Sequence, residues 1–325
     1  MNTQDWDLLR SVSRSFYISI RLLPRSLRET VALAYLLARS SDTIADTVAI
    51  DVDLRIAMLQ QFAQAIQQST SATAEEMRCR FVPLQQHEAE RELITKTDGL
   101  LRNLEGLRAE DRKDVRALLA TIMRGQLLDL TRWRNGLRAL ATVDELREYT
   151  YLVAGCVGEF WTSIGFRNIN GFADRSESQM LDLGRRYGSG LQLVNILRDA
   201  GSDLRAGRCY FSATELASAG LTPSDVLLEP SKFWPIYGKW IDEARTGLES
   251  GVEYSAAIRN ARVRAATCLP ALIGARTLHL IQERGVHSLS EKVKVPRSEV
   301  RAIIASVAIT LAAPDRVRAT FNRLR

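Results

Sequence analysis

The spacing of the apolar residues is the feature that most constrains the fold of this chain. Apolar residues recur at intervals of three and four from one end to the other, whereas strict alternation over the length of a strand is hard to find. The first pattern is typical of amphipathic helices, and the second would indicate strands. We therefore expect an all-α protein. The expected helices are Leu27 to Ala45, Leu54 to Gln68, Ala89 to Asn103, Ala109 to Leu137, Val143 to Gly165, Ser176 to Asp203, Pro230 to Val252, Arg259 to Arg284 and Arg297 to Leu311.

Length and composition suggest how many domains to expect. The chain has 325 residues, of which 46% are hydrophobic and 25% charged, and it contains no low-complexity or linker-like stretch. This supplies enough apolar material for one large core. We expect a single all-helical domain over residues 1–325, although the length also permits two.

Charge, cysteine and histidine content narrow the class of site. The net charge of +6 suits anionic partners such as diphosphates, membrane surfaces or nucleic acid, without choosing among them. The four cysteines are far apart and show no CxxC spacing, and there are only three histidines. This argues against a zinc site or a disulfide framework, and it favours a reducing cytosol.

Neither a targeting segment nor a membrane span is expected. The chain begins Met-Asn-Thr-Gln-Asp-Trp-Asp, without a basic region followed by an apolar run. The apolar stretch from Ile303 to Ala313 has eleven residues, fewer than the roughly 20 that a spanning helix needs. We expect a cytoplasmic protein that can make peripheral contact with the inner face of the membrane.

Two pairs of aspartates at i, i+4 spacing are the main chemical signal. Asp42 and Asp46 share a helix face with Tyr35 and Arg39, in a polar stripe with spacings of 4, 3 and 4. Like charges one turn apart destabilise a helix, so a cation is expected between them. A solvated helix face is the alternative interpretation of one such stripe.

A second stripe makes that alternative less attractive. Its members are Gln192, Asn195, Asp199 and Asp203, at spacings of 3, 4 and 4, with Arg198 beside them. Facing each other across a helical bundle, the two stripes would form a central cavity with acids at its mouth and apolar walls. Mg2+ prefers oxygen ligands and binds through one or two carboxylates together with water and substrate phosphates. The sequence therefore predicts a magnesium–diphosphate site.

At this point the chain resembles a known family, the squalene and phytoene synthases, which join prenyl diphosphates head to head. The matching motifs occur in the family's order and are spread over most of the chain. They are Ser11-Val-Ser-Arg-Ser-Phe16, Tyr35-Leu-Leu-Ala-Arg-Ser-Ser-Asp-Thr-Ile-Ala-Asp46, Tyr149-Thr-Tyr-Leu-Val-Ala-Gly-Cys-Val-Gly-Glu159, Gln192-Leu-Val-Asn-Ile-Leu-Arg-Asp-Ala-Gly-Ser-Asp203 and Gly207-Arg-Cys-Tyr-Phe211.

The resemblance implies the all-α isoprenoid-synthase fold and condensation of two allylic diphosphates. It also implies roles for individual residues. Mg2+ would be held by Asp42, Asp46, Asn195, Asp199 and Asp203. Phosphate oxygens would be contacted by Arg39 and Arg198, with Arg14 as a weaker candidate. Tyr35 and Gln192 would complete the substrate site, although Tyr35 could instead form a hydrogen bond across the core.

Tyr149 matches the tyrosine to which the family assigns proton abstraction as the cyclopropane of presqualene or prephytoene diphosphate closes. A neutral phenol is a poor base, so released diphosphate could take the proton through it. Neighbouring Tyr151 could be confused with it, and a structural role is the alternative for either. The small residues in Val153-Ala-Gly-Cys-Val-Gly158 would leave room for a prenyl tail or allow close helix packing.

The product is harder to predict. Residues 268–278 and Val293-Lys-Val-Pro-Arg297 resemble the part of squalene synthases that helps to bind NADPH. Lys294 and Arg297 are therefore candidate NADPH contacts, with surface charge as the alternative. Against this, Ala45 stands where many squalene synthases carry Glu, as an apolar residue does in some carotenoid-type members.

The sequence thus favours a monomeric, Mg2+-dependent prenyltransferase that makes squalene from farnesyl diphosphate with NADPH and does not bind nucleic acid. The alternatives are a phytoene or dehydrosqualene synthase without reductant, or a synthase that stops at presqualene diphosphate. From another class, a basic helical chain could be a nucleic-acid or membrane-surface scaffold without turnover.

Overall fold

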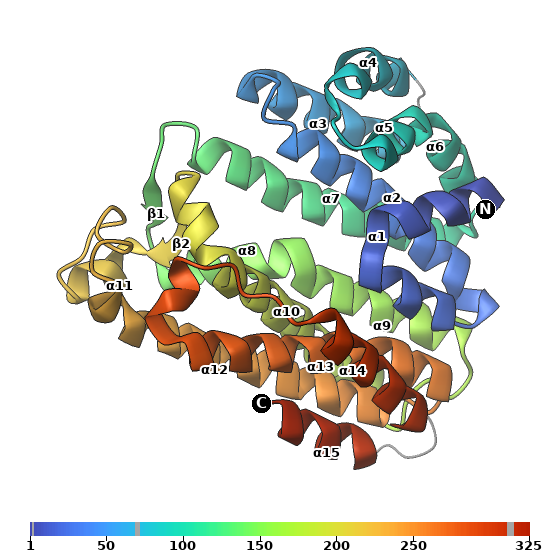
Figure 1. The fold of residues 1–325 in the computed structure, drawn as a ribbon. Helices are drawn as coiled ribbons and strands as arrows, with labels where there is room; N and C mark the ends of the chain where they lie inside the picture. Colours follow the sequence, from blue (N-terminus) through green and yellow to red (C-terminus); the bar gives the residue numbers. More distant parts are fainter. Residues whose placement is uncertain (2, 69–71, 311–314) are drawn as a thin grey trace. The chain divides into compact units, whose positions relative to one another are not determined.

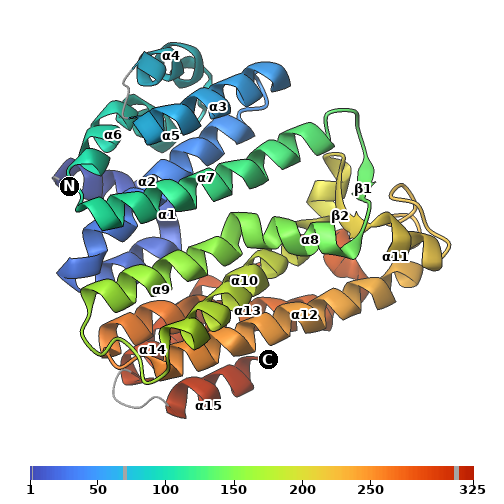
Figure 2. The same cartoon turned by 180° about the vertical axis from the view of Figure 1, so that it is seen from behind.

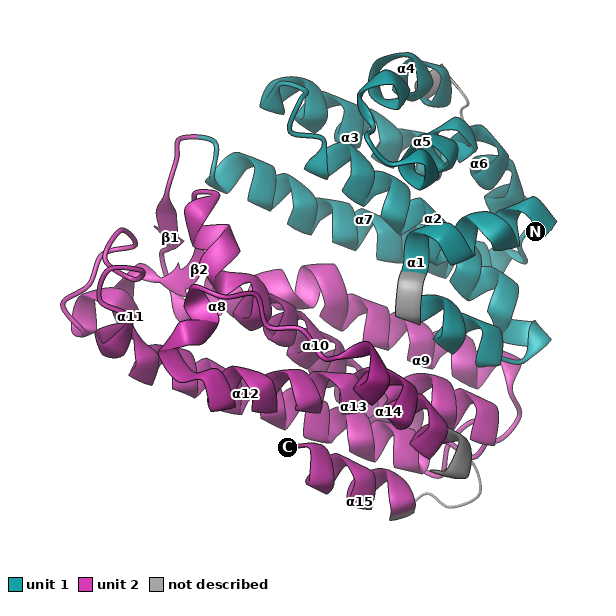
Figure 3. Cartoon of the chain, in the orientation of Figure 1, with its two compact units in different colours: residues 1–134 teal, residues 135–325 magenta. Residues whose placement is uncertain are grey.

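The computed structural model describes residues 1, 3–68, 72–310 and 315–325, without the side chains of residues 14, 15, 72, 73, 308–310 and 315. Helices make up most of this part of the chain (Figure 1), which confirms the all-α prediction. Residue contacts divide the chain into two compact units, Met1–Arg134 and Asn135–Arg325 (Figure 3). A single domain over residues 1–325 stays a prediction.

The first unit is built around helix α2, which packs against α1, α3, α5, α6 and α7. Pro24 precedes α2, and Leu33, Leu36, Leu37 and Ile44 on its apolar face are buried. The elements of this unit are α1 (Thr3–Leu22), α2 (Arg25–Asp46), α3 (Val52–Gln68), α4 (Ala72–Phe81), the 3-10 turn η1 (Val82–Leu84), α5 (Glu88–Thr95), α6 (Thr97–Glu105) and α7 (Ala109–Arg132).

The second unit is built around helix α10, which lies between α9 and α12 in both views (Figures 1 and 2). A capping box between Ser176 and Gln179 starts this helix. The elements of this unit are β1 (Arg138–Leu140), α8 (Val143–Thr150), the π-helical turn η2 (Tyr151–Gly155), α9 (Cys156–Asn168), α10 (Glu177–Arg205), β2 (Arg208–Ser212), α11 (Ala213–Ser218), α12 (Pro230–Ala257), α13 (Ala261–Arg284), the 3-10 turn η3 (Gly285–Leu289), α14 (Arg297–Thr310) and α15 (Asp315–Leu324).

Glycines let α10 approach its neighbours closely. A Cβ atom on Gly158 of α9 would lie 1.9 Å from the carbonyl oxygen of Gly184, and one on Gly190 would lie 2.7 Å from Cα of Gly247 in α12. Both distances are far below van der Waals contact. At Gly158 this supports close helix packing, the alternative interpretation of the small residues in segment 153–158. Room for a prenyl tail along that segment stays a prediction.

Three predicted helix ranges need correction. The helix expected over Ala89 to Asn103 is two helices, because α5 ends at Thr95 and α6 begins at Thr97. The helix expected to reach Leu137 ends at Arg132, shortly before a glycine with φ of +93° at Gly136. The helix expected over Val143 to Gly165 is interrupted by η2. The predicted end of the last helix, Leu311, lies outside the described residues.

Several elements were not predicted, most of them short. β1 and β2 form a parallel two-stranded sheet in which Arg138 pairs with Arg208. Strands of three and five residues are too short to produce a clear alternation. The helices α1, α4, α11 and α15 were also missed. Within the described ranges, no helix has both the length and the apolar character needed to cross a bilayer.

Candidate active site

The first aspartate pair lies at the end of α2, in the first unit. Asp42 accepts a hydrogen bond from Nε2 of Gln126 on α7, and Nη1 of Arg39 lies 3.8 Å from its Oδ2. Asp46 interacts electrostatically with Arg55, whose Nη1 donates to the carbonyl oxygen of Ala45 at 2.7 Å. The structure thus gathers a carboxylate pair and three polar partners at one end of this unit.

The protonation of Asp42 is unusual. Burial and the neighbouring Asp46 carboxylate raise the pKa of Asp42 to about 6, while Arg39 and Gln126 oppose this shift. Solvent still reaches 44% of the Asp42 side chain, so water screens part of the repulsion. A divalent cation between the two carboxylates would remove the repulsion that raises this pKa.

Arg39 and Tyr35 lie on the same helix as the acids, but both are already engaged. Nη2 of Arg39 donates to Oε1 of Glu90 on α5 at 2.8 Å. The ring of Tyr35 stacks on Phe16 with centroids 5.1 Å apart, and its hydroxyl lies 3.4 Å from the carbonyl oxygen of Val12. These contacts favour the core interpretation of Tyr35. The side chain of Arg14, the weaker phosphate candidate, lies outside the described residues.

The second aspartate pair lies on α10, in the second unit, and borders a cavity. Arg198 donates from Nε to Oδ1 of Asp199 at 3.1 Å, and Arg208 donates from Nη2 to Oδ1 of Asp203 at 2.7 Å. Burial raises the pKa of Asp203, while Arg208 opposes the shift. The cavity has a volume of about 260 Å3. It is lined by Gln192, Asn195, Ile196, Asp199, Ser202, Asp203, Arg208, Tyr210 and Lys292.

All four members of the second stripe line this cavity, as the helical spacing of the stripe predicts, whereas Arg198 beside them does not. Asn195 donates from Nδ2 to Oε1 of Gln192 at 3.3 Å, so the two amides form a pair on the wall. Arg208, Tyr210 and Lys292 were missed as site residues. The quoted motif around residues 207–211 contains the first two, whereas no motif indicates Lys292.

Tyr149 is buried next to this cavity. Its ring stacks on Tyr210 with centroids 5.0 Å apart, and the two hydroxyl oxygens are separated by 3.4 Å. Tyr151 is oriented differently, because its hydroxyl donates to Oε2 of Glu159 at 3.1 Å. Of Tyr149 and Tyr151, it is therefore Tyr149 that contacts the cavity wall, through Tyr210.

Lys294 lies on the segment that leads into α14, and Arg297 is the first residue of that helix. The side chains of Val293 and Val295 are buried, whereas Lys294 and Arg297 are exposed. Among the described residues, neither cation forms an ion pair with an acidic side chain. Their charges suit the phosphates of NADPH, but this cofactor contact stays a prediction.

A larger cavity, of about 790 Å3, lies between η2, α10 and α12 and contains neither aspartate pair. Its three arginines already contact acids. Arg147 forms a two-point ion pair with Glu243, and Arg185 and Arg186 share Asp182. The arginines do not distinguish the two cavities, because Arg208 in the smaller one is also paired with an acid. The smaller cavity is the candidate diphosphate site because it contains Asp199 and Asp203.

The acidic residues fit a hydrated magnesium ion better than a metal held by protein atoms alone. In the part of the chain that the structure describes, no three His, Cys, Asp or Glu side chains group closely enough to hold a metal. Each pair supplies carboxylate oxygens, and Gln126 adds a buried Oε1 that accepts no hydrogen bond from the described residues. Mg2+ commonly completes such a partial set with water and phosphate oxygens.

Fold and site together define an all-helical protein with two acidic helix faces, each supplied with arginines. The sequence family model "Squalene/phytoene synthase" matches residues 9–299. This chain therefore belongs to the squalene/phytoene synthase family.

Individual relatives agree with this family. The chain is 30% identical over 209 residues to squalene synthase ERG9 of Saccharomyces cerevisiae, a match that covers 63% of this chain and 44% of the yeast protein. It is 27% identical over 226 residues to a bifunctional lycopene cyclase/phytoene synthase of Colletotrichum graminicola, covering 69% and 36%. The matches thus span less than half the length of these two relatives.

Solved structures share the fold. TcSQS in complex with the ligand E5700 superposes with a TM-score of 0.76 at 22% identity, covering 98% of this chain and 95% of that one. A dehydrosqualene synthase in complex with a ligand gives a TM-score of 0.69 at 20% identity, covering 95% and 97%. Identities this low establish similarity of fold alone.

Proposed function

We propose that this protein is a Mg2+-dependent prenyltransferase that joins two farnesyl diphosphates head to head to presqualene diphosphate and reduces this product with NADPH to squalene. The observation that carries the proposal is the pair of acidic helix faces, at Asp42 and Asp46 and at Asp199 and Asp203, in a chain of the squalene/phytoene synthase family.

The chemistry requires an allylic carbon–oxygen bond to break, with both electrons leaving on diphosphate. Bound Mg2+ would supply positive charge that stabilises the departing diphosphate. Its ligands would be Asp42, Asp46, Asn195, Asp199 and Asp203. Arg39 and Arg198 would exchange their present carboxylate partners for phosphate oxygens, to which a guanidinium binds through paired hydrogen bonds.

Tyr149 and Tyr210 would take part in the proton transfer that accompanies closure of the cyclopropane. Carbon–carbon bond formation leaves a cation that closes the cyclopropane by losing a proton, and released diphosphate is the stronger base available. A phenol at the Tyr149 oxygen can pass this proton on, and the hydroxyl of Tyr210 lies 3.4 Å away on the cavity wall. Burial of Tyr149 keeps this position dry, which protects a carbocation from water.

A phytoene or dehydrosqualene synthase is the second candidate. Ala45 in the first acidic motif and the similarity to a bifunctional lycopene cyclase/phytoene synthase favour it. Such an enzyme would use the same acids and Tyr149 without a reductant. A synthase that stops at presqualene diphosphate is a related possibility.

Incubation of the pure protein with labelled farnesyl diphosphate and Mg2+, with and without NADPH, separates these functions. Squalene formed only with NADPH supports the first proposal. Dehydrosqualene, or presqualene diphosphate that accumulates in the presence of NADPH, supports the alternatives. Phytoene from labelled geranylgeranyl diphosphate supports the phytoene synthase. Asp199→Asn is the inactive control. If the wild-type protein forms no product from any of the allylic diphosphates offered, the proposal of a head-to-head prenyltransferase is contradicted.

A further inference from the structure

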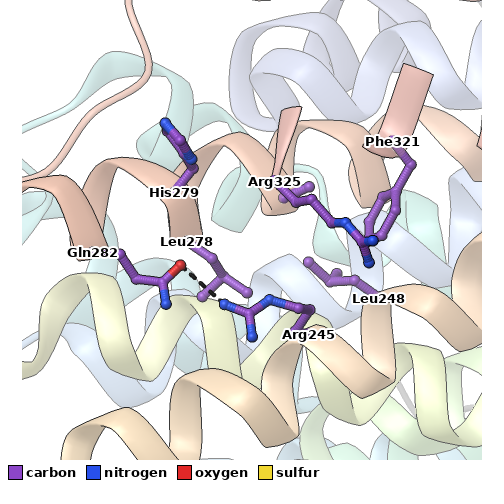
Figure 4. A pocket seen from close by; sticks show the side chains of 8 residues that line it. Arg245, Leu248, Leu278, His279, Gln282, Phe321 and Arg325 are labelled. Carbon is purple, nitrogen blue, oxygen red and sulfur yellow. Dashed lines mark hydrogen bonds between the residues drawn. The ribbon is translucent and has the colours of Figure 1, made fainter. Parts of the chain in front are cut away.

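Helix α12 is a firm support for its neighbours in the second unit. It has 28 residues, and Figure 4 shows how its second half packs against α13 and α15. There Arg245 donates to Oε1 of Gln282 at 2.9 Å, and Leu248 and Phe321 line the space between the helices. This space is about 10 Å3, about enough for a single water molecule. Groups that bind to α12 are therefore held in a fixed place.

The two elements that carry Tyr149 and Tyr210 are short. Helix α8 has eight residues, and β2 has five residues in a sheet of two strands. Helices of this length and two-stranded sheets are at best marginally stable on their own. The two rings have centroids 5.0 Å apart and hydroxyl oxygens 3.4 Å apart. This contact therefore depends on how α8 and β2 are attached to longer elements.

Arg147 attaches α8 to α12. It precedes Tyr149 by two residues and forms a two-point ion pair with Glu243, in which Nε donates to Oε1 at 2.9 Å and Nη2 to Oε2 at 3.0 Å. Its guanidinium carbon also lies 6.0 Å from the centroid of the Trp240 ring. Paired hydrogen bonds and a cation over an aromatic ring restrict orientation as well as distance. Arg147 thus fixes the turn of α8 that contains Tyr149.

Glu215 of α11 attaches β2 to the same part of α12. Ser212, the last residue of β2 and two residues after Tyr210, donates from Oγ to Oε2 of Glu215 at 2.8 Å. Oε2 also accepts from Nε1 of Trp240 at 3.2 Å, and Oε1 accepts from Nζ of Lys239 at 2.7 Å. Burial raises the pKa of Glu215, but these three hydrogen bonds outweigh burial and lower the pKa overall. The carboxylate is therefore ionised at neutral pH and binds all three donors.

Trp240 is the residue that both attachments share. Its side chain is fully buried, and it contacts Arg147 through its ring and Glu215 through its N–H. The Trp240 cluster consists of Arg147, Glu215, Lys239, Trp240 and Glu243. Of the described residues that line the cavity with the second aspartate pair, none belongs to this cluster. The cluster can therefore influence that cavity only by placing other residues.

We propose that Trp240 is a positioning residue, which through the Trp240 cluster keeps the hydroxyls of Tyr149 and Tyr210 in contact. The inference rests on the proposed function, in which these two hydroxyls take part in proton transfer. Loss of the indole N–H removes one of the three hydrogen bonds that hold Glu215, and with Glu215 the end of β2. A displacement of about 1 Å between reacting groups can lower a rate about 100-fold.

Trp240→Phe tests the proposal, because phenylalanine keeps a buried aromatic ring but has no N–H. We expect kcat to fall about tenfold, while the KM for farnesyl diphosphate and the Mg2+ requirement stay within about twofold. Trp234→Phe makes the same change elsewhere on α12, where the ring packs against Tyr237, and should turn over as the wild type does. In a Tyr149→Phe background, Trp240→Phe should cause little further loss, because its effect passes through the missing hydroxyl.

Fluorine NMR of protein labelled with fluorotyrosine measures the arrangement without substrate. The signals of Tyr149 and Tyr210, each assigned by substitution with phenylalanine, should move in Trp240→Phe. The signal of Tyr254, whose hydroxyl contacts Thr162, should stay in place. If Trp240→Phe does not fold by circular dichroism, Arg147→Lys replaces it. Lysine cannot form the two-point pair at this exposed position, so the same pattern is expected.

Four results would each overturn the proposal. They are a loss of kcat no larger than in Trp234→Phe, a loss of the same size in the Tyr149→Phe background, a loss explained by a raised KM, and unmoved signals of both tyrosines. Wild-type protein that forms no product contradicts the proposed function, and the fluorine signals then test separately whether Trp240 sets the contact between the two tyrosines.

Discussion

Gln126 of α7 donates a hydrogen bond to Asp42 of α2, which connects the first acidic motif to a helix 84 residues away in sequence. Gln126 is buried, and Arg39 is the other group that favours the ionised form of Asp42. Gln126 therefore positions a candidate metal ligand and helps to keep it charged.

Replacing Gln126 with Leu should raise the pKa of Asp42 further, because the hydrogen bond to its carboxylate is lost. We expect the acid limb of the pH–rate profile to move to higher pH and Mg2+ activation at neutral pH to weaken by about tenfold. Gln60→Leu, on the exposed face of α3, is the matched control. A pH profile identical to that of the wild type would show that Gln126 has only a structural role.

Mg2+ affinity should depend on pH through Asp42. With a pKa of about 6, this carboxyl is mostly protonated at acidic pH, and a protonated carboxyl cannot bind a metal. We expect Mg2+ activation to weaken about tenfold one pH unit below this pKa, relative to neutral pH. Mg2+ titrations of turnover measure this, and Asp42→Asn should remove most of the dependence.

The raised pKa of Asp42 affects folding stability in the opposite direction from Mg2+ affinity, because higher pH favours metal binding but lowers stability. Because the folded chain favours protonated Asp42, the stabilisation from this group is complete below its ordinary pKa of 3.8 and is lost as pH rises through about 6. Denaturant unfolding without Mg2+ should therefore show Asp42→Asn gaining stability over the wild type above this pH. No gain at neutral pH would contradict the raised pKa.

Tyr149→Phe should reduce turnover by about 100-fold or more while the protein stays folded, because the substitution keeps the ring stacked on Tyr210 and removes only the hydroxyl. Tyr151→Phe is the matched control, since that hydroxyl contacts Glu159. Single-turnover measurements with each variant, together with thermal unfolding, distinguish the two roles. Equal losses at both tyrosines would argue against Tyr149 as the proton-handling residue.

Gly158→Ala should destabilise the protein by about 3 kcal/mol or more, because the new methyl group would meet the backbone of Gly184 at 1.9 Å. Gly238→Ala in α12 is the control. A Cβ there has nothing within 4 Å, and alanine favours the helix by about 1 kcal/mol. Urea unfolding measures both changes, and a neutral Gly158→Ala would show that α9 and α10 can separate at little cost.

Several long, regularly patterned helices were predictable from sequence, although the 20-residue helix α1 was missed. The range Leu54 to Gln68 falls within α3 at Val52–Gln68, and Ser176 to Asp203 nearly matches α10 at Glu177–Arg205. In these stretches the apolar spacing is continuous and the ends carry ordinary signals, such as the Ser176 cap. The helical spacing likewise predicted that Gln192, Asn195, Asp199 and Asp203 share one face, and they line one cavity.

The site residues and turns that were not predicted depend on packing between segments distant in sequence. Gln126 and Arg208 contact the acidic residues from α7 and β2, and Lys292 lines the cavity from the segment before α14. Helical periodicity indicates none of these positions, although the motif at residues 207–211 includes Arg208. The π-helical turn at Tyr151–Gly155 lies where tight packing at Gly155 and Gly158 shapes the backbone, so helical periodicity could not reveal it. The dipeptide Asn135-Gly136 before β1 is a turn signal in the sequence. The predicted helix that extends to Leu137 did not take it into account.

The short connection from Asp203 to Tyr210 fixes which side chains meet in the cavity. Arg208 and Tyr210 alternate along β2 with the buried Cys209 and Phe211, and both line the cavity that contains Asp203. Inserting or deleting one residue after Gly207 would turn Arg208 and Tyr210 to the opposite side of the strand. Asp203 would then lose its counter-ion and Tyr149 its neighbouring hydroxyl in a single step, so this connection tolerates changes of residue type better than changes of length.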